Sequence, residues 1–122
     1  MNKRAINTYE DLPKWGILFL EMISNIKKGV ITIITPEGKY LKYSGIKEGE
    51  EVTIRINDWR FCEELFLKGD IGLGESYISG YWDCENINKL IQLGVENYKE
   101  LERVIKGSFL KIIFYRIKHI LN

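Results

Sequence analysis

The chain has 122 residues, with 18 Lys and Arg against 17 Asp and Glu and 45% hydrophobic residues, which is an ordinary globular composition. This length suits one domain and is too short for a TIM barrel of about 250 residues. The near-neutral charge gives no indication of nucleic-acid binding. However, residues 50–102 have 12 acidic and 5 basic side chains, whereas residues 103–122 have 5 basic and none acidic.

The first half of the chain predicts a helix followed by strands. Apolar residues at helical spacing predict a helix over residues 9–28. Residues 30–35 and 39–43 flank a Pro-Glu-Gly turn signal and predict a hairpin. We expect a polar loop over residues 45–49 and then a third strand that places Val52, Ile54 and Ile56 on one face.

The second half predicts helices. The first runs from Trp59 to about Lys68, with Phe61, Leu65 and Cys62 inward, and ends at Gly69. A connection rich in glycine and aromatic residues follows over residues 70–84. The next helix starts near Asn86, and its expected inward residues are Ile87, Leu90, Ile91 and Val95.

A last, long helix is expected over residues 98–121. Because strands and helices are separate along the chain, the fold class is α+β, with a small, mainly antiparallel sheet covered by helices. We expect residues 1–97 to form the domain and residues 98–122 to form a basic amphipathic helix.

One motif suggests a cofactor turn. Residues 70–74 read DIGLG, which is similar to the D-x-G-x-G turn that binds S-adenosylmethionine in methyltransferases. The charged helical stretch before it is wrong for that role, because a buried strand should precede the turn. Only 48 residues follow, too few for the remaining parallel sheet. We therefore interpret the segment as a glycine-permitted turn between helices and expect no cofactor.

Other candidate chemistry is sparse. A buried Glu75 beside Tyr77 and Trp82 is either a catalytic acid or a residue that bonds loop amides. Cys62 and Cys84 are expected to be buried free thiols, and His119 alone cannot complete a His and Cys metal set. We expect no metal site and no catalytic residue.

The C-terminal segment is more informative. Its apolar residues, including Phe109 and Phe114, lie nearly all round the expected helix and are interleaved with Arg103, Lys106, Lys111, Arg116 and Lys118. Such a helix packs on the domain, docks on a partner, or lies on an anionic membrane. No uncharged stretch of 18 residues and no signal peptide is evident, so we expect a cytoplasmic protein. The basic apolar helix adds the expectation that it is peripheral at the inner membrane surface.

Three stretches resemble the N-terminal domain of cyclopropane-fatty-acyl-phospholipid synthases. Residues 29–38 (GVITIITPEG) are similar to the opening pattern of that domain, G-x-L-x-V-x-x-P-D-G. The similarity strengthens at residues 54–61 (IRINDWRF). It is strongest at residues 69–83 (GDIGLGESYISGYWD), where the family has G-D-x-G-x-G-E-x-Y-x-x-G-x-W-D. Asn86 and Asn88 stand where an acidic residue is usual.

The resemblance implies a sterol-carrier-protein-like fold and a role in presenting phospholipid acyl chains to an S-adenosylmethionine-dependent methyltransferase domain. The family's catalytic domain follows this region, and we expect this chain to be the accessory module alone. The candidate lipid-facing or partner-facing residues are Glu75, Tyr77, Tyr81, Trp82, Phe109 and Phe114.

Three functions remain open. The first is a non-catalytic module that binds lipid or membrane. The second is an interaction module that docks on a methyltransferase subunit or forms a homodimer. The third and weakest is a stand-alone enzyme. For the aromatic residues at 59 and 61, a solid core competes with an apolar groove.

Overall fold

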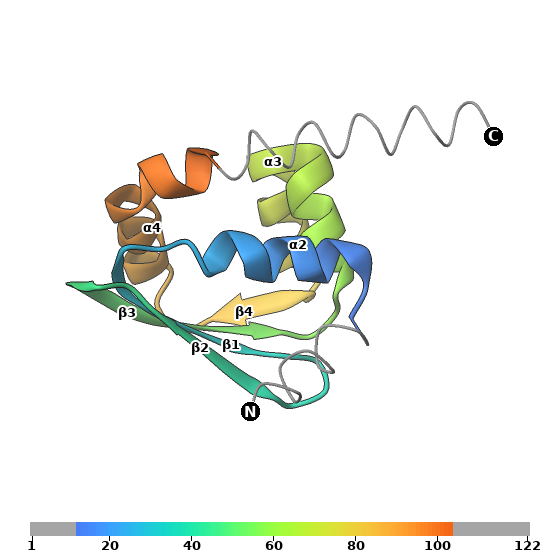
Figure 1. Ribbon diagram of the computed structural model, residues 1–122. Helices are drawn as coiled ribbons and strands as arrows, with labels where there is room; N and C mark the ends of the chain where they lie inside the picture. Colours follow the sequence, from blue (N-terminus) through green and yellow to red (C-terminus); the bar gives the residue numbers. More distant parts are fainter. Residues whose placement is uncertain (1–11, 104–122) are drawn as a thin grey trace.

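The computed structural model describes residues 12–103. Within this range the elements are α2 (Lys14–Ile23), β1 (Lys28–Ile34), β2 (Tyr40–Ser44), β3 (Lys47–Ile56), α3 (Arg60–Ile78), β4 (Trp82–Cys84) and α4 (Ile87–Glu96). Residues 98–103 are also helical. The α+β class is confirmed, and Figure 1 shows the helices gathered above one face of the sheet.

The sheet has four strands in the order β2-β1-β3-β4. β1 pairs antiparallel with β2 and parallel with β3, and β4 pairs antiparallel with β3. The sheet is therefore mixed. The predicted hairpin is confirmed, whereas β4 was missed because a strand of three residues has too short an alternation to recognise.

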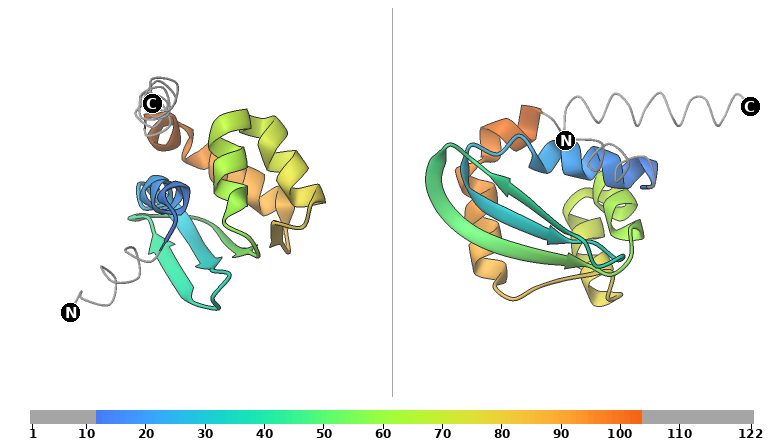
Figure 2. Two further views of the ribbon diagram at one scale, coloured as in Figure 1. Left: turned by 90° about the vertical axis from the view of Figure 1, so that its right-hand side faces the viewer. Right: turned by 60° about the horizontal axis from the view of Figure 1, so that its bottom comes forward.

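The two faces of the sheet differ in polarity. Val52, Ile54 and Ile56 alternate toward the helices and are at most 6% exposed, as predicted. The opposite face presents polar residues such as Lys42, Thr53 and Arg55, all exposed. Figure 2 shows this face turned toward the viewer in its right-hand view. The helices thus cover one face only, although Ile34, which pairs with Arg55, is also buried at 6% exposure.

Several predicted boundaries need correction. The first helix ends at Ile23 rather than at residue 28, and Lys28 already belongs to β1. β3 begins at Lys47, so the polar loop expected over residues 45–49 is partly strand. Here residues 48–50 oppose the single residue Gly29, because Lys28 pairs with Lys47 and Val30 with Glu51. This bulge disturbs the alternation on which the prediction relied.

The segment after Gly69 departs most from the predicted elements. Residues 70–78, part of the connection predicted over residues 70–84, are helical and form the second half of α3, while Gly69 forms the kink between the halves with φ 63°. A left-handed φ is readily available to glycine. A Cβ on Gly72 would overlap the carbonyl oxygen of Glu64, so this glycine lets the two halves of α3 lie against each other.

The inward face of α4 is also different from the predicted one. Leu93 is 4% exposed and Leu90 is half-buried, whereas Ile91 and Val95 are 60% and 64% exposed. Ile87 is 39% exposed. The prediction of these three isoleucine and valine residues as inward was wrong, because buried Asn97 sets the rotation of the helix.

Candidate functional site

The segment with the strongest motif has a packing role. Asp70 to Gly74 lies within the second half of α3, so it forms no loop after a strand. Gly72 within it permits a close contact with the first half of α3, and Gly69 just before it forms the kink. The expected turn between helices was therefore wrong, because these residues continue α3.

Trp82 is a buried residue of the core and lies outside the exposed surface. Its ring is 5% exposed, and its Nε1 donates a hydrogen bond to the Leu73 carbonyl oxygen at 3.1 Å. The ring lies 5.6 Å from that of Phe61 and 5.0 Å from that of Tyr77, centroid to centroid. β4 is thereby fixed against both halves of α3.

Glu75 and Tyr77 lie at the surface of α3. The carboxylate of Glu75 is 57% exposed and is 3.7 Å from the Lys68 ammonium group, which is also 3.2 Å from Glu64. The expectation of a buried Glu75 was wrong, because its carboxylate is exposed and ion-paired with Lys68. Tyr77 is 40% exposed and covers Trp82.

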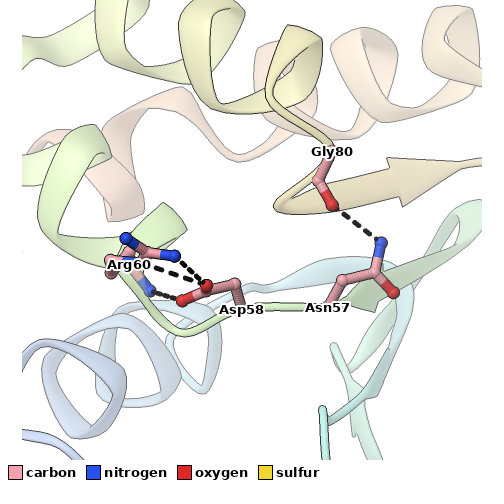
Figure 3. A network of polar contacts seen from close by, with 4 residues as sticks. All are labelled: Asn57, Asp58, Arg60 and Gly80. Carbon is pink, nitrogen blue, oxygen red and sulfur yellow. Dashed lines mark hydrogen bonds and ion pairs between the residues drawn. The ribbon is translucent and has the colours of Figure 1, made fainter.

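A polar network joins the start of α3 to the turn before β4. The Arg60 guanidinium donates to Asp58 at 2.7 Å, and the Asn57 side chain donates to the Gly80 carbonyl oxygen at 3.0 Å (Figure 3). Arg60 also lies 4.8 Å from the ring centre of Tyr81. Tyr81 is half-buried.

The charges of this network are matched. The hydrogen bond from Arg60 lowers the pKa of Asp58, and the same bond raises the pKa of Arg60. Asp58 is therefore ionised and paired with the Arg60 guanidinium, and this pairing makes it a weak base. The network connects two loops, and nothing in its geometry favours catalysis.

An apolar cavity lies between the sheet and the helices. Its volume is about 190 Å³ and its wall is almost entirely apolar. Residues from α2, the sheet, α3 and α4 contribute, among them Phe19, Ile23, Ile54, Phe61, Leu93 and Leu101. For Phe61 the sequence left open a solid core or an apolar groove. In the structure Phe61 is buried in the core and also lines the cavity. Trp59 is only partly buried and lies outside this wall.

Gly94 forms part of this wall. It lies on the inward face of α4, and no heavy atom lies within 4 Å of where its Cβ would be. Glycine inside a helix costs about 1 kcal/mol relative to alanine. No close contact in the structure requires a glycine here, and the position has open space for a side chain.

A row of exposed apolar side chains marks the other face of the same helix. Ile87, Ile91 and Val95 are spaced four residues apart, and Tyr98 continues the row three residues later. The last three are 60–64% exposed. We call these four residues the α4 row. Sequence reasoning noticed the spacing but assigned it to the core.

Most of the predicted basic face lies outside residues 12–103. Arg103 is exposed at the end of the described range. Lys106, Phe109, Lys111, Phe114, Arg116 and Lys118 lie outside the described residues, so their proposed contact with lipid or a partner stays a prediction.

The two cysteines are buried and free, as predicted. Burial raises the pKa of both thiols, which therefore stay protonated at neutral pH. Among residues 12–103 no group of His, Cys, Asp and Glu is arranged to hold a metal ion. In the same range no helix has the length and apolar character needed to cross a bilayer.

Comparison with known proteins gives partial similarity to one class of enzyme. The chain is 35% identical over 48 residues to "Cyclopropane-fatty-acyl-phospholipid synthase" of Escherichia coli strain K12, and it matches the protein of the same name from Escherichia coli O6:H1 to the same extent. The match covers 36% of this chain and 13% of each relative. No protein-family model and no solved structure matches the chain.

Proposed function

We propose that this chain is a non-catalytic accessory module that binds phospholipid acyl chains and presents them to a methyltransferase domain, in a system similar to cyclopropane-fatty-acyl-phospholipid synthases. The apolar cavity between the sheet and the helices carries this proposal. Apolar cavities bind apolar ligands because ligand surface is removed from water there. The partial similarity to the two Escherichia coli synthases supports the lipid as the ligand class.

The proposal includes a sterol-carrier-protein-like fold and a peripheral location at the inner membrane surface. The one-sided helical cover of the sheet supports the first. The basic residues from Arg103 onward support the second, since cations near a bilayer are attracted to anionic headgroups. The division of the chain after residue 97 is part of the same proposal.

Co-sedimentation with vesicles tests the function. The full chain is mixed with phosphatidylglycerol or phosphatidylcholine vesicles, and the bound fraction is measured at low and physiological salt. We expect preference for the anionic vesicles, weakened by salt. Binding to neither vesicle, or equal binding to both, contradicts the membrane role.

A matched pair of variants tests the basic segment. Reversing the charge of Arg103, Lys106 and Lys111 to Glu should abolish the preference for anionic vesicles. The control reverses three cations that are exposed elsewhere, Lys39, Lys42 and Lys89. If the control variant loses binding to the same extent, any exposed cation attracts the anionic vesicles, and the C-terminal segment has no special role.

The α4 row favours a second function, docking on a separate methyltransferase subunit. A row of exposed large apolar residues on one helix face is typical of a protein interface. Replacing Ile91 and Val95 by Ser should weaken capture of a synthase catalytic domain, whereas Ile46→Ser, at a residue 90% exposed elsewhere, should not. A chain that sediments as a monomer and ignores the catalytic domain contradicts this function.

A further inference from the structure

The cavity wall offers no hydrogen-bonding partner to a ligand. Trp82 is the wall residue with a side-chain N–H group, and that group already donates to the Leu73 carbonyl oxygen at 3.1 Å. Within residues 12–103 every buried side-chain nitrogen and oxygen has a hydrogen-bond partner. A carbonyl or carboxylate that entered would lose its bonds to water without replacement. The cavity therefore disfavours the polar part of a lipid.

The size of the cavity limits how much of a chain can enter. Pockets that enclose whole small ligands have about 300–1,000 Å³. This cavity has about 190 Å³. An apolar protein cavity of about 150 Å³ stays dry and takes a benzene molecule, so this one suits about six to eight carbon atoms. Only the end of an acyl chain fits.

Gly94 determines that size from the α4 side. It lies on the helix face that also carries Leu90, Leu93 and Asn97, with open space where its side chain would begin. Because Gly94 belongs to the cavity wall, a side chain here is expected to take up part of the space. The wall opposite is formed by residues of the sheet and α2, such as Ile54 and Ile23, that are at most 6% exposed and already packed.

We infer that the cavity is a binding site for the bare methyl end of an unbranched hydrocarbon chain, and that Gly94 is the residue that sets its capacity. This inference rests on the proposed function and names the part of the lipid that enters the domain. The carboxyl and headgroup portion stays outside.

The test uses n-hexane as the probe and 1,6-hexanediol as its polar counterpart of equal length. Methyl NMR spectra of the full chain report on Ile23 and Leu93 at the cavity wall and on Ile91 in the exposed α4 row. We expect saturable shifts at the two wall residues with n-hexane and none with the diol. Equal shifts with both probes, or shifts confined to Ile91, overturn the inference.

Variants of Gly94 then test its role. Gly94→Leu should weaken n-hexane binding about tenfold or more, because it fills space for several carbon atoms. Gly94→Ala, which adds one methyl group to open space, should weaken binding less and guards against a folding defect in the larger variant. Unchanged binding in both variants overturns the role of Gly94.

Gly74 supplies the matched control. It also lies within a helix with no atom near its missing Cβ, but it is exposed on α3 and outside the cavity. Gly74→Leu should bind n-hexane as the unmodified chain does. If vesicle binding is present while n-hexane fails to reach the wall, this inference falls and the proposed function stands. If n-hexane binds the wall and vesicles of neither kind are bound, the membrane role falls instead.

Discussion

The side chain of Asn97 forms a reciprocal pair of hydrogen bonds with the backbone of Lys28. Its Oδ1 accepts from the Lys28 N–H at 3.0 Å, and its Nδ2 donates to the Lys28 carbonyl oxygen at 2.9 Å. The same Oδ1 accepts from the Lys27 N–H at 2.8 Å. Asn97 is completely buried. One amide therefore fixes the end of α4 to the first residue of β1, 69 positions earlier in the chain.

We expect Asn97→Leu to reduce the free energy of unfolding by about 3 kcal/mol, because it leaves buried backbone N–H groups without a partner. Urea denaturation measures this loss. Asn88→Leu is the control, since Asn88 is exposed on the same helix and should change stability by less than about 0.5 kcal/mol. A loss at Asn97 no larger than at Asn88 would show that the pair is unimportant.

The two glycines of the second half of α3 should respond in opposite directions. Gly72→Ala places a methyl group against the Glu64 carbonyl oxygen, and we expect it to destabilise the fold by about 1–3 kcal/mol. Gly74→Ala meets no atom and should stabilise it by about 0.5–1 kcal/mol through helix propensity. Thermal or urea unfolding measures both. Similar effects at both positions would rule out the close packing of the α3 halves.

Trp82→Phe removes the indole hydrogen bond together with part of a buried ring. The variant keeps an aromatic ring against Phe61 but removes the donor to Leu73, so we expect a loss of about 1 kcal/mol or more in denaturation experiments. Trp59→Phe removes an indole bond to Glu37 that is exposed, and its loss should be smaller. If both variants lose the same free energy of unfolding, burial of the Trp82 hydrogen bond does not add to stability.

Alkaline pH should destabilise the protein through Cys62. Burial raises the pKa of this thiol above its ordinary value of 9.0, which applies to the unfolded chain. Above pH 9 the unfolded state therefore binds fewer protons than the folded state, and stability falls as pH rises, by about 1.4 kcal/mol per pH unit for one thiol. Below that pH the contribution is constant.

Denaturation curves from pH 8 to 10.5 measure this slope for the natural chain and for Cys62→Ala. The variant loses stability at every pH because a core atom is removed, so the slopes rather than the values are compared. A slope unchanged in Cys62→Ala would show that the thiol of Cys62 is not protected by the fold.

The strands could be predicted well because alternation reports directly on a one-sided sheet. Val52, Ile54 and Ile56 face the helices as their spacing indicated. The pattern failed at residues 48–50, where the bulge opposite Gly29 removes the period of two. β4 was missed because its three residues give no period.

The helices were harder to predict than the strands, for two physical reasons. Gly72 and Gly74 predict a turn locally, but the packing of Gly72 against Glu64 overrides this preference. The buried face of α4 was misassigned because a polar residue, Asn97, determines it through bonds to a distant strand. For the candidate site, the sequence indicated that aromatic residues such as Phe61 line either a core or an apolar groove. The cavity itself arises where residues of α2, the sheet, α3 and α4 meet, which no residue pattern specifies.

The short length of β4 leaves part of the β3 edge unpaired, which bears on how the protein would aggregate. β4 pairs with β3 only through Ile54, Arg55 and Ile56, so among residues 12–103 no strand pairs with that edge of β3 before Ile54. α4 packs against β3, and Glu96 accepts a hydrogen bond from the N–H of Glu50 in the bulge at 3.2 Å. Loosening of α4 would therefore expose a template for strand addition between molecules. Aggregation of this protein should begin with release of that helix, ahead of complete unfolding.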